Sequence, residues 1–203
     1  MPQDLSAVAW PVRTSRLSIR PATPEDLDAT WDFRRLPEVC EWLTHANEDH
    51  DGYAEVFLDP DRLTSTLVVE RDGAVIGDLM LRIQDPWSQA EVADRARGRQ
   101  AELGWVVTPE HSGRGYVTEA AAELLRICFA DLGLYRVTAL CFSDNVPSWR
   151  IMERIGMRRE AHNVRDSLHR TRGWLDGYGY ALLADEWRAG LNPRPGSAGS
   201  DLG

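Results

Sequence analysis

The segment ELGWVVTPEHSGRGYVTEAA, residues 102–121, decides the fold of this chain. Residues 101–108 are apolar and β-branched, which is typical of a buried strand, and residues 118–131 carry apolar side chains at helical spacing. Between them stands the tight turn Gly113-Arg114-Gly115. The free N–H groups and positive dipole end of the following helix would point into this turn, where they can bind phosphate oxygens. Glycine also permits a sharp corner for steric reasons alone, so the turn by itself leaves both interpretations open.

Two familiar nucleotide-binding motifs do not fit this turn. A P-loop needs the run GxxxxGK followed by Ser or Thr, and the chain has no such run. A dinucleotide-binding turn needs GxGxxG, but Thr118 stands where the third glycine would be. If the turn binds phosphate, it does so in another kind of fold.

Strands and helices alternate on both sides of this segment. An Asp-Gly pair at 72–73 is a strong hairpin signal, and Thr23 followed by Pro24 is typical of a helix start. Before the central segment we expect a strand at 16–23, a helix after it, a hairpin at 65–83, and a loop or short surface helix at 85–100. After it we expect a strand at 136–143, a helix from Pro147 to Gly156, and a strand that runs into a short helix at 172–187. The order strand, helix, hairpin, strand, helix, strand, helix, strand predicts an α/β or α+β protein with a mixed sheet.

The composition is that of an ordinary globular protein. The chain has 203 residues, 43% apolar and 27% charged, which suits one domain with a substantial core. Its net charge of −9 disfavours a nucleic-acid or ribosome-surface binder, which needs a basic face. No apolar run has membrane-spanning length and the N-terminus shows no export signal, so we expect a cytoplasmic protein without a membrane partner. Three widely spaced cysteines without a CxxC motif indicate reduced core thiols.

A second motif gives the turn a context. Together with ELGWVVTP and SGRGYVTEA, the segment NVPSWRIMERIGM at 145–157 resembles the GNAT superfamily of acyl-CoA-dependent N-acetyltransferases. The closest resemblance is to the RimJ/RimL type, which includes ribosomal-protein N-terminal acetyltransferases. It implies a GNAT-like fold, a splayed central sheet flanked by helices. We expect a single domain of this kind at 14–189, after an N-terminal extension at 1–13 and before a disordered tail at 190–203.

The resemblance implies acetyl-CoA as co-substrate and places it. In this family the pantetheine arm lies between two splayed parallel strands, here 102–107 and 136–142, and the pyrophosphate lies on the turn and helix start. The resemblance assigns cofactor binding to Trp105, Val106 and Val107 on the strand, to Ser112, Gly113, Arg114, Gly115, Tyr116, Val117 and Thr118 at the turn, and to Asn145 and Ser148 near the sulfur.

The chain departs from the family pattern at three positions. Ser112 stands where the family has Gln or Arg, and Val117 stands where it has Gly or Ala. Both changes put affinity slightly in doubt. Met152 occupies the position of the usual tyrosine general acid, so another group must protonate the leaving thiolate.

Acyl transfer to nitrogen requires a neutral amine. Neutralising a lysine side chain at pH 7 costs roughly 4–5 kcal/mol, but an α-amine costs only about 1–1.5 kcal/mol, so a modest base suffices for the latter. The resemblance makes Glu102 the candidate base; the alternative is a rim carboxylate in a surface ion pair. Ser148 is the candidate acid; the alternative is an ordinary hydroxyl in the first helical turn. A backbone N–H of Val106 or Val107 would stabilise the oxyanion.

Two further groups of residues belong to the acceptor side of the family. Tyr178, Tyr180 and Asp176 lie in the closing strand, although aromatic strand residues are more often core. The segment at 44–53 carries two histidines among acids and is predicted to be a solvated rim loop rather than a metal site. No metal is expected.

The sequence therefore predicts an acetyl-CoA-dependent N-acetyltransferase acting on a primary amine. The acceptor is open among a protein N-terminus, a lysine and a small amine, and homodimers are common in the family. The alternative is a catalytically impaired CoA-binding regulatory or scaffold protein, which Met152 and Ser112 keep in consideration.

Overall fold

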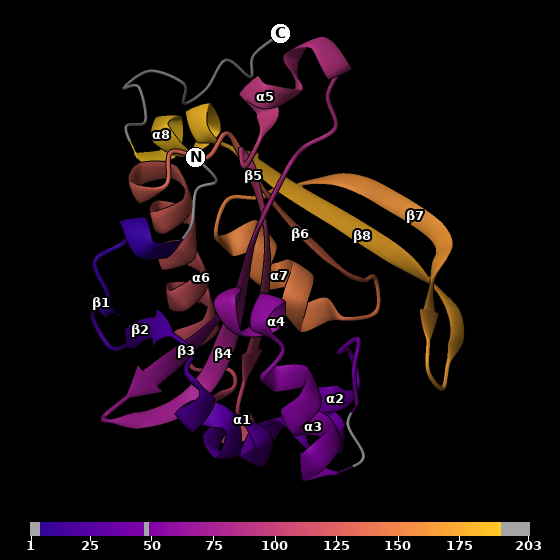
Figure 1. The fold of residues 1–203 in the computed structure, drawn as a ribbon. Coiled ribbons are helices and arrows are strands. Elements are labelled where there is room, and N and C mark those ends of the chain that lie inside the picture. The colour runs from indigo at the N-terminus through magenta and orange to yellow at the C-terminus, as the bar shows by residue number, and fades with distance from the viewer. Residues whose placement is uncertain (1–4, 47–48, 192–203) are drawn as a thin grey trace, which may run out of the picture.

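The computed structural model describes residues 5–46 and 49–191 (Figure 1). They form one mixed sheet of eight strands in the order β1-β2-β3-β4-β5-β6-β8-β7. Within it only β5 and β6 run parallel; every other neighbouring pair is antiparallel. The strands are β1 Val12–Arg13, β2 Ser18–Pro21, β3 Thr66–Arg71, β4 Ala74–Gln84, β5 Gln100–Val107, β6 Arg136–Phe142, β7 Arg158–His169 and β8 Gly173–Leu183. This confirms the mixed α/β class.

Helices lie on both faces of the sheet. The main helices are α1 Leu27–Arg34, α2 Pro37–Cys40, α3 His50–Phe57, α4 Pro60–Thr64, α6 Tyr116–Arg126, α7 Val146–Arg154 and α8 Ala184–Leu191. Shorter turns are η1 Leu5–Ala7, η2 Pro24–Asp26, η3 Ala90–Val92, α5 Ala93–Ala96, η4 Pro109–His111 and the π-helical turn η5 Ile127–Asp131. No helix in the described ranges is long and apolar enough to span a bilayer.

Alternate residues of β3 reach two different cores. Leu67 and Val69 pack in the large cluster that includes Leu124 of α6, whereas Val68 packs with Tyr53 of α3. Because successive strand side chains point to opposite faces, α6 and α3 cover opposite sides of the sheet. Both faces of β3 are therefore buried, and its four residues from Thr66 to Val69 are all buried.

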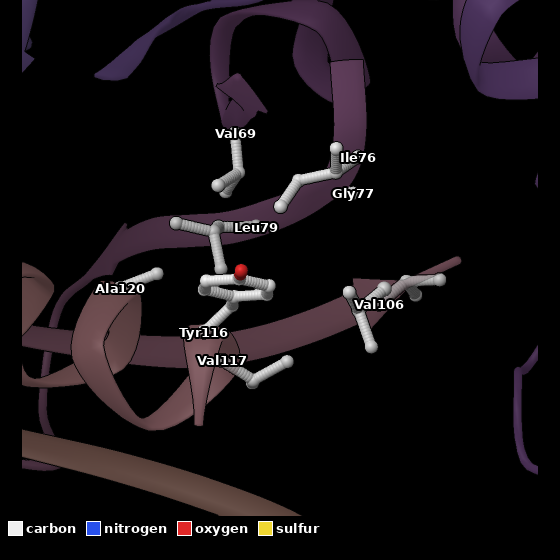
Figure 2. A pocket seen from close by; sticks show the side chains of 9 residues that line it. Val69, Ile76, Gly77, Leu79, Val106, Tyr116, Val117 and Ala120 are labelled. Atoms are coloured by element: carbon white, nitrogen blue, oxygen red, sulfur yellow. The ribbon is translucent and has the colours of Figure 1, made fainter. Parts of the chain in front are cut away.

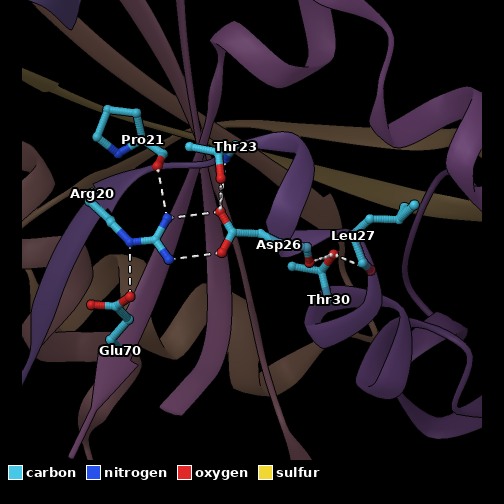
Figure 3. A network of polar contacts seen from close by, with 7 residues as sticks. All are labelled: Arg20, Pro21, Thr23, Asp26, Leu27, Thr30 and Glu70. Atoms are coloured by element: carbon cyan, nitrogen blue, oxygen red, sulfur yellow. Dashed lines mark hydrogen bonds and ion pairs between the residues drawn. The ribbon is translucent and has the colours of Figure 1, made fainter. Parts of the chain in front are cut away.

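The start of α1 is fixed by the polar network in Figure 3. Asp26 accepts a hydrogen bond from the backbone N–H of Thr23 at 2.8 Å, which holds the turn η2 that begins at Pro24. The guanidinium of Arg20 binds both oxygens of Asp26 at 2.8 Å and also reaches Glu70 at 2.8 Å. The helix start predicted from Thr23 and Pro24 is confirmed, and the network joins it to β2 and β3.

The predicted hairpin is confirmed as β3 and β4. Asp72 and Gly73 both have positive φ, 52° and 83°, and Arg71 pairs with Ala74 across the turn. The two central residues at positive φ are those of the hairpin turns whose twist matches the strands. The 85–100 segment contains η3 and α5, as expected of a short surface helix.

Four expectations need correction. The strand β7 was not predicted, because its residues are mostly polar and exposed and its register is broken twice, which removes the apolar alternation. The segment at 44–53 is not wholly a loop: α3 begins at His50, and Tyr53 is 2% exposed. Helix α6 begins at Tyr116, two residues before the predicted helical run at 118–131, and its last turn η5 is π-helical. Helix α8 reaches Leu191, and the remaining part of the predicted tail, 192–203, lies outside the described residues.

Candidate active site

The sheet opens between β5 and β6. Their parallel pairing comprises only the register from Gln100 opposite Arg136 to Glu102 opposite Thr138. Beyond these positions β5 continues to Val107 paired with β4 alone, and β6 continues to Phe142 paired with β8 alone. The central sheet is therefore splayed, as predicted, and a wedge separates the carboxyl-terminal halves of the two strands.

The backbone of β5 presents free groups to this wedge. Thr108 donates its N–H to Ile76 of β4 at 2.9 Å. Backbone N–H groups alternate in direction along a strand, so the N–H of Val106 also points toward β4. The N–H groups of Trp105 and Val107 therefore point toward β6. No β6 residue pairs with them in the described structure. The wedge therefore has an unpaired strand edge on which an extended amide chain can bind.

At the end of the wedge the chain makes the glycine turn. Gly113 and Gly115 have φ of 72° and 79°, the left-handed region, so both glycines are required by the backbone. No described residue accepts a hydrogen bond from the N–H of Gly113, Arg114 or Gly115. The first bond at the start of α6 runs from the N–H of Glu119 to the carbonyl of Gly115 at 3.0 Å, which leaves the N–H groups of residues 116–118 free as well.

There is room over this turn. A Cβ added at Gly113 would meet no atom within 4 Å, and one added at Gly115 would meet only the Arg16 Nη2 atom at 3.5 Å. Ser112, Gly113, Arg114 and Gly115 are exposed. The turn is therefore an open cradle of N–H donors at a helix N-terminus, the arrangement that binds phosphate.

A contact that the sequence did not indicate fixes the turn. Glu119 accepts hydrogen bonds from Thr14, from Ser15 and from the backbone N–H of Arg16. The Nε of Arg16 also binds Glu119 at 2.6 Å, while its Nη1 donates to the carbonyl of Arg114 at 3.1 Å. Burial raises the pKa of Glu119, but these hydrogen bonds outweigh burial and lower it overall. The partners in these contacts are about a hundred residues apart in the chain, so no local sequence pattern indicates them.

Tyr116 anchors the turn to the core, as Figure 2 shows. Tyr116 is 6% exposed, and its side chain lines a small apolar pocket together with Val69, Ile76 and Leu79. The guanidinium carbons of Arg16 and Arg71 lie 4.6 and 5.0 Å from the centre of the ring. The side chain of Tyr116 is therefore structural, and only its backbone faces the cradle.

The residues of α7 have structural partners. Asn145 is the N-cap of α7, and its Oδ1 accepts a hydrogen bond from the Ser148 N–H at 3.3 Å. Ser148 is half-buried in the first turn of the helix. Met152 is 1% exposed in the main core, so the position of the family's tyrosine acid holds a core side chain.

Tyr180 also lies in the core. It is 2% exposed, and its hydroxyl donates to Glu153 at 3.1 Å. Burial raises the pKa of Tyr180 to about 12, and the bond to Glu153 contributes to the rise. Tyr178 is half-buried, with its ring edge-on to His162, which in turn binds Asp176 at 2.7 Å. Cys141 on β6 is a free thiol whose pKa burial raises to about 11, while Cys40 and Cys128 are free and buried.

Glu102 stands at the last paired position before the wedge opens. It is half-buried, and its Oε2 accepts a hydrogen bond from Gln84 Nε2 at 3.0 Å. Directly opposite it on β4 is Arg82, and beside it on β6 is Thr138. The side chain thus lies at the closed end of the wedge, where β5 and β6 begin to separate.

Aromatic and basic side chains join the segment after α2 to the β7–β8 hairpin. Trp42, Phe142 and His169 lie with ring centres 5.3 to 5.8 Å apart. His169 Nε2 is 2.9 Å from the carbonyl of Glu41, and Arg170 donates to the carbonyls of Cys40 and Leu43. No three His, Cys, Asp or Glu side chains of the described ranges gather as metal ligands, and His50 pairs with Asp28.

Comparisons with known proteins agree with this geometry. A family model described as an acetyltransferase (GNAT) domain matches residues 16–158. An uncharacterized N-acetyltransferase of Bacillus subtilis, YnaD, is 30% identical over 177 residues, which cover 87% of this chain and 98% of the relative. The crystal structure of a GNAT-family acetyltransferase from Bacillus anthracis has a TM-score of 0.72 at 26% identity, covering 86% of this chain and 98% of that one. The fold is also that of spermidine N-acetyltransferase from Vibrio cholerae in complex with CoA and spermine, with a TM-score of 0.71 at 20% identity, covering 86% and 99%.

Proposed function

This chain belongs to the GNAT family of acetyltransferases and is an N-acetyltransferase. We propose that it binds acetyl-CoA in the wedge between β5 and β6, and that it acetylates a primary amine whose proton Glu102 accepts. The observation that carries the proposal is the continuity of two features. An unpaired strand edge at Trp105 and Val107 leads directly to the free N–H groups of the turn at 113–118.

The residues present fit acetyl-CoA. The amides of its pantetheine arm need backbone partners, which the N–H groups of Trp105 and Val107 can supply. Its pyrophosphate needs several N–H donors and open space, which the turn and the start of α6 supply. The exposed guanidinium of Arg114 adds positive charge there. The N–H of Val106 points toward β4, so this residue can contact the cofactor only through its other atoms. Ser112 contributes its hydroxyl, because its N–H donates to the carbonyl of Pro109.

Each step of the chemistry has a candidate in this chain. When bound, acetyl-CoA supplies an acetyl thioester for transfer to nitrogen. Glu102 accepts the proton that the ammonium group of the acceptor must lose. The N–H of Val107 points into the wedge and donates to the carbonyl oxygen as negative charge develops there. Ser148 donates a proton to the departing sulfur and recovers it from solvent, while Asn145 holds the first turn of α7 in place.

The subtype and acceptor are also proposed. The sequence resemblance supports a RimJ/RimL-like enzyme, whose acceptor would be an amine on a protein or a small molecule. The neighbour from Vibrio cholerae contains spermine, and a polyamine is a second acceptor class to test. A catalytically impaired CoA-binding protein would share the wedge and cradle, so turnover must be measured beside binding.

Thermal unfolding with and without acetyl-CoA tests the proposal. A ligand at about 100 times its dissociation constant adds roughly 2.7 kcal/mol of stability. For a domain of this size we expect the melting temperature to rise by roughly 5–11 °C. Absence of a rise in the folded protein would overturn the proposed site. A rise without turnover of acetyl-CoA in the presence of any amine would favour the impaired alternative.

Replacing Ser148 by alanine tests the proposed acid. The N-cap bond from Asn145 uses the backbone N–H of residue 148, so the variant keeps α7 and its stability. We expect kcat to fall at least about tenfold if the hydroxyl protonates the leaving sulfur. Ser143→Ala, in the loop before α7, is the matched control and retains activity. Equal kcat values in the two variants would show that the Ser148 hydroxyl has no catalytic role and is an ordinary hydroxyl in the first turn of α7.

A further inference from the structure

Arg82 and Glu102 are opposite charges that face each other without pairing. They are directly opposed in the antiparallel register of β4 and β5, so both side chains leave the same face of the sheet. Glu102 accepts its hydrogen bond from Gln84 at 3.0 Å, whereas Arg82 Nη2 donates to Met80 Sδ at 3.3 Å. Within the described ranges neither side chain forms an ion pair with the other or with any residue. Both charges are left for a ligand.

A second guanidinium approaches from α4. The N–H of Leu81 donates to the carbonyl of Ser65 at 2.9 Å, so the end of α4 lies beside β4. Arg62 of α4 is half-buried, yet its side chain donates no hydrogen bond to any described residue and forms no ion pair with one. Burial lowers the pKa of Arg62, and the positive charges of Arg34 and, to a smaller extent, Arg82 lower it further.

The carboxylate whose charge acts on Arg62, that of Asp78, is already engaged. Asp78 is 2% exposed and binds the guanidinium of Arg34 through both oxygens at 2.6 Å. The negative charge of Asp78 raises the pKa of Arg62, while the positive charge of Arg34 lowers it. Neither Arg62 nor Arg82 forms an ion pair with a carboxylate of the described residues, although Glu102 lies opposite Arg82. Guanidinium forks bind a carboxylate with paired hydrogen bonds.

We propose that Arg62 and Arg82 bind the carboxylate of the acceptor while its amino group lies against Glu102, so that the acceptor is a free amino acid. The inference rests on the proposed role of Glu102 in amine acetylation. Opposed residues of an antiparallel pair stand about 4.5–5.5 Å apart at Cα, which suits a ligand whose ammonium and carboxylate are separated by one carbon. A polyamine has no group for the two guanidiniums and is repelled by them.

The transfer step balances with these groups. The ammonium of the amino acid loses a proton to Glu102, and the neutral nitrogen forms a bond to the acetyl carbon. The acylated nitrogen then loses its second proton to solvent, from which Ser148 recovers the proton that it gives to the sulfur. The carbon–sulfur bond breaks, and the sulfur leaves as a thiolate that Ser148 protonates. The products are an N-acetyl amino acid and CoA, and the carboxylate held by Arg62 and Arg82 is unchanged. Nothing is oxidised or reduced.

The test compares each L-amino acid with its C-terminal amide, which keeps the α-amine but removes the negative charge. For the preferred amino acid we expect kcat/KM to exceed that of its amide at least tenfold. Arg82→Gln and Arg62→Gln should each lower kcat/KM for the amino acid, so that its ratio to the value for the amide falls toward one. A tenfold change corresponds to about 1.4 kcal/mol. Arg188→Gln, an exposed arginine on α8, is the matched control.

A binding measurement separates this inference from the proposed function. Calorimetric titration of the preferred amino acid into the CoA-saturated protein should show binding that Arg82→Gln abolishes. Arg82 is exposed, so this variant folds even if Arg62→Gln does not. The inference is overturned if spermidine or the amides are acetylated as well as the amino acids, if no amino acid is acetylated, or if the preference survives in the Arg82 variant. Stabilisation by acetyl-CoA in those cases would leave the proposed function standing.

Discussion

Glu102 owes its position to one register in the sheet. It lies at the point where the pairing of β5 with β6 ends, so its side chain stands beside the wedge rather than inside a continuous sheet. Gln84 holds one of its carboxylate oxygens at 3.0 Å, which orients the group while leaving the other oxygen without a partner among the described residues. A carboxylate placed in this way can accept a proton from an amine at the closed end of the wedge.

Glu102→Gln tests this residue. The amide keeps the size of the side chain but cannot accept the proton, so we expect kcat to fall about 10²–10⁴-fold. The rise in melting temperature with acetyl-CoA should not change, because the cradle lies elsewhere. Glu55→Gln, an exposed residue on α3, is the control and keeps full activity. If Glu102→Gln also keeps full activity, the carboxylate is only a rim group.

Three other residues have roles that their positions in the sequence did not reveal. Tyr116 is placed in the cofactor turn by its sequence, but its ring packs in the core. Asn145 is near the expected thioester end, and its side chain caps α7. Glu119 was not singled out at all, although it accepts the hydrogen bonds of Thr14, Ser15 and Arg16 that fix the turn. In each case the burial or the partner is decided by distant residues.

At the scale of elements, the turn and α6 act as one unit. The positive φ of Gly113 and Gly115 turns the chain so that six consecutive N–H groups, from 113 to 118, have no carbonyl partner among the described residues. The helix supplies the partial positive charge at the same place. Arg16 and Glu119 tie the unit to the chain before β2. The strand edge of β5 leads into this unit, and the two elements together make the proposed site.

Gly115→Ala tests the turn against a matched glycine. Gly133, after η5, also has positive φ, 60°, with open space around it. Alanine at either position should cost about 1–2 kcal/mol of stability, since the left-handed region is unfavourable for it. Only Gly115→Ala should raise the KM for acetyl-CoA, by about tenfold or 1.4 kcal/mol, because its Cβ enters the cradle. Steady-state kinetics and urea unfolding of both variants measure this; equal KM values would place the pyrophosphate elsewhere.

At the scale of the whole molecule, a buried ion pair joins one face of the sheet to the N-terminal helices. Arg34 of α1 reaches across to Asp78 of β4, opposite Val106 in the wedge strand. Burial lowers the pKa of Arg34, but Asp78 outweighs it and keeps the guanidinium charged. The pair thus fixes the N-terminal helices relative to the strand that borders the site. Loss of one partner would leave a buried charge uncompensated.

Asp78→Asn tests this connection. We expect the free energy of unfolding to fall by about 3–5 kcal/mol, because Arg34 stays buried without its partner. Asp185→Asn breaks an exposed pair with Arg188 and should change stability by no more than about 0.5 kcal/mol. Urea midpoints of the two variants give the comparison. A loss in Asp78→Asn no larger than in the control would show that the pair is dispensable for stability.

The sequence by itself determined the elements that carry a local signal. The Asp-Gly turn, the Thr23-Pro24 helix start, the glycine turn and the strand before it are decided by backbone preferences within a few residues, and all are present in the structure. Strand β7 and the beginning of α3 have no such signal. The former is a polar edge strand, and the latter is a short helix that is buried only through Tyr53 and Phe57.

Only the tertiary structure decided where the pairing of β5 and β6 ends, and with it the wedge. It also brought the end of α4, which carries Arg62, beside β4, and placed Arg82 of β4 opposite Glu102. These relations join residues 20 to 36 positions apart, so they depend on sheet register and helix packing and not on local propensity. The sequence determined which chemical groups the site contains, and packing determined which of them remain without partners for a ligand to bind.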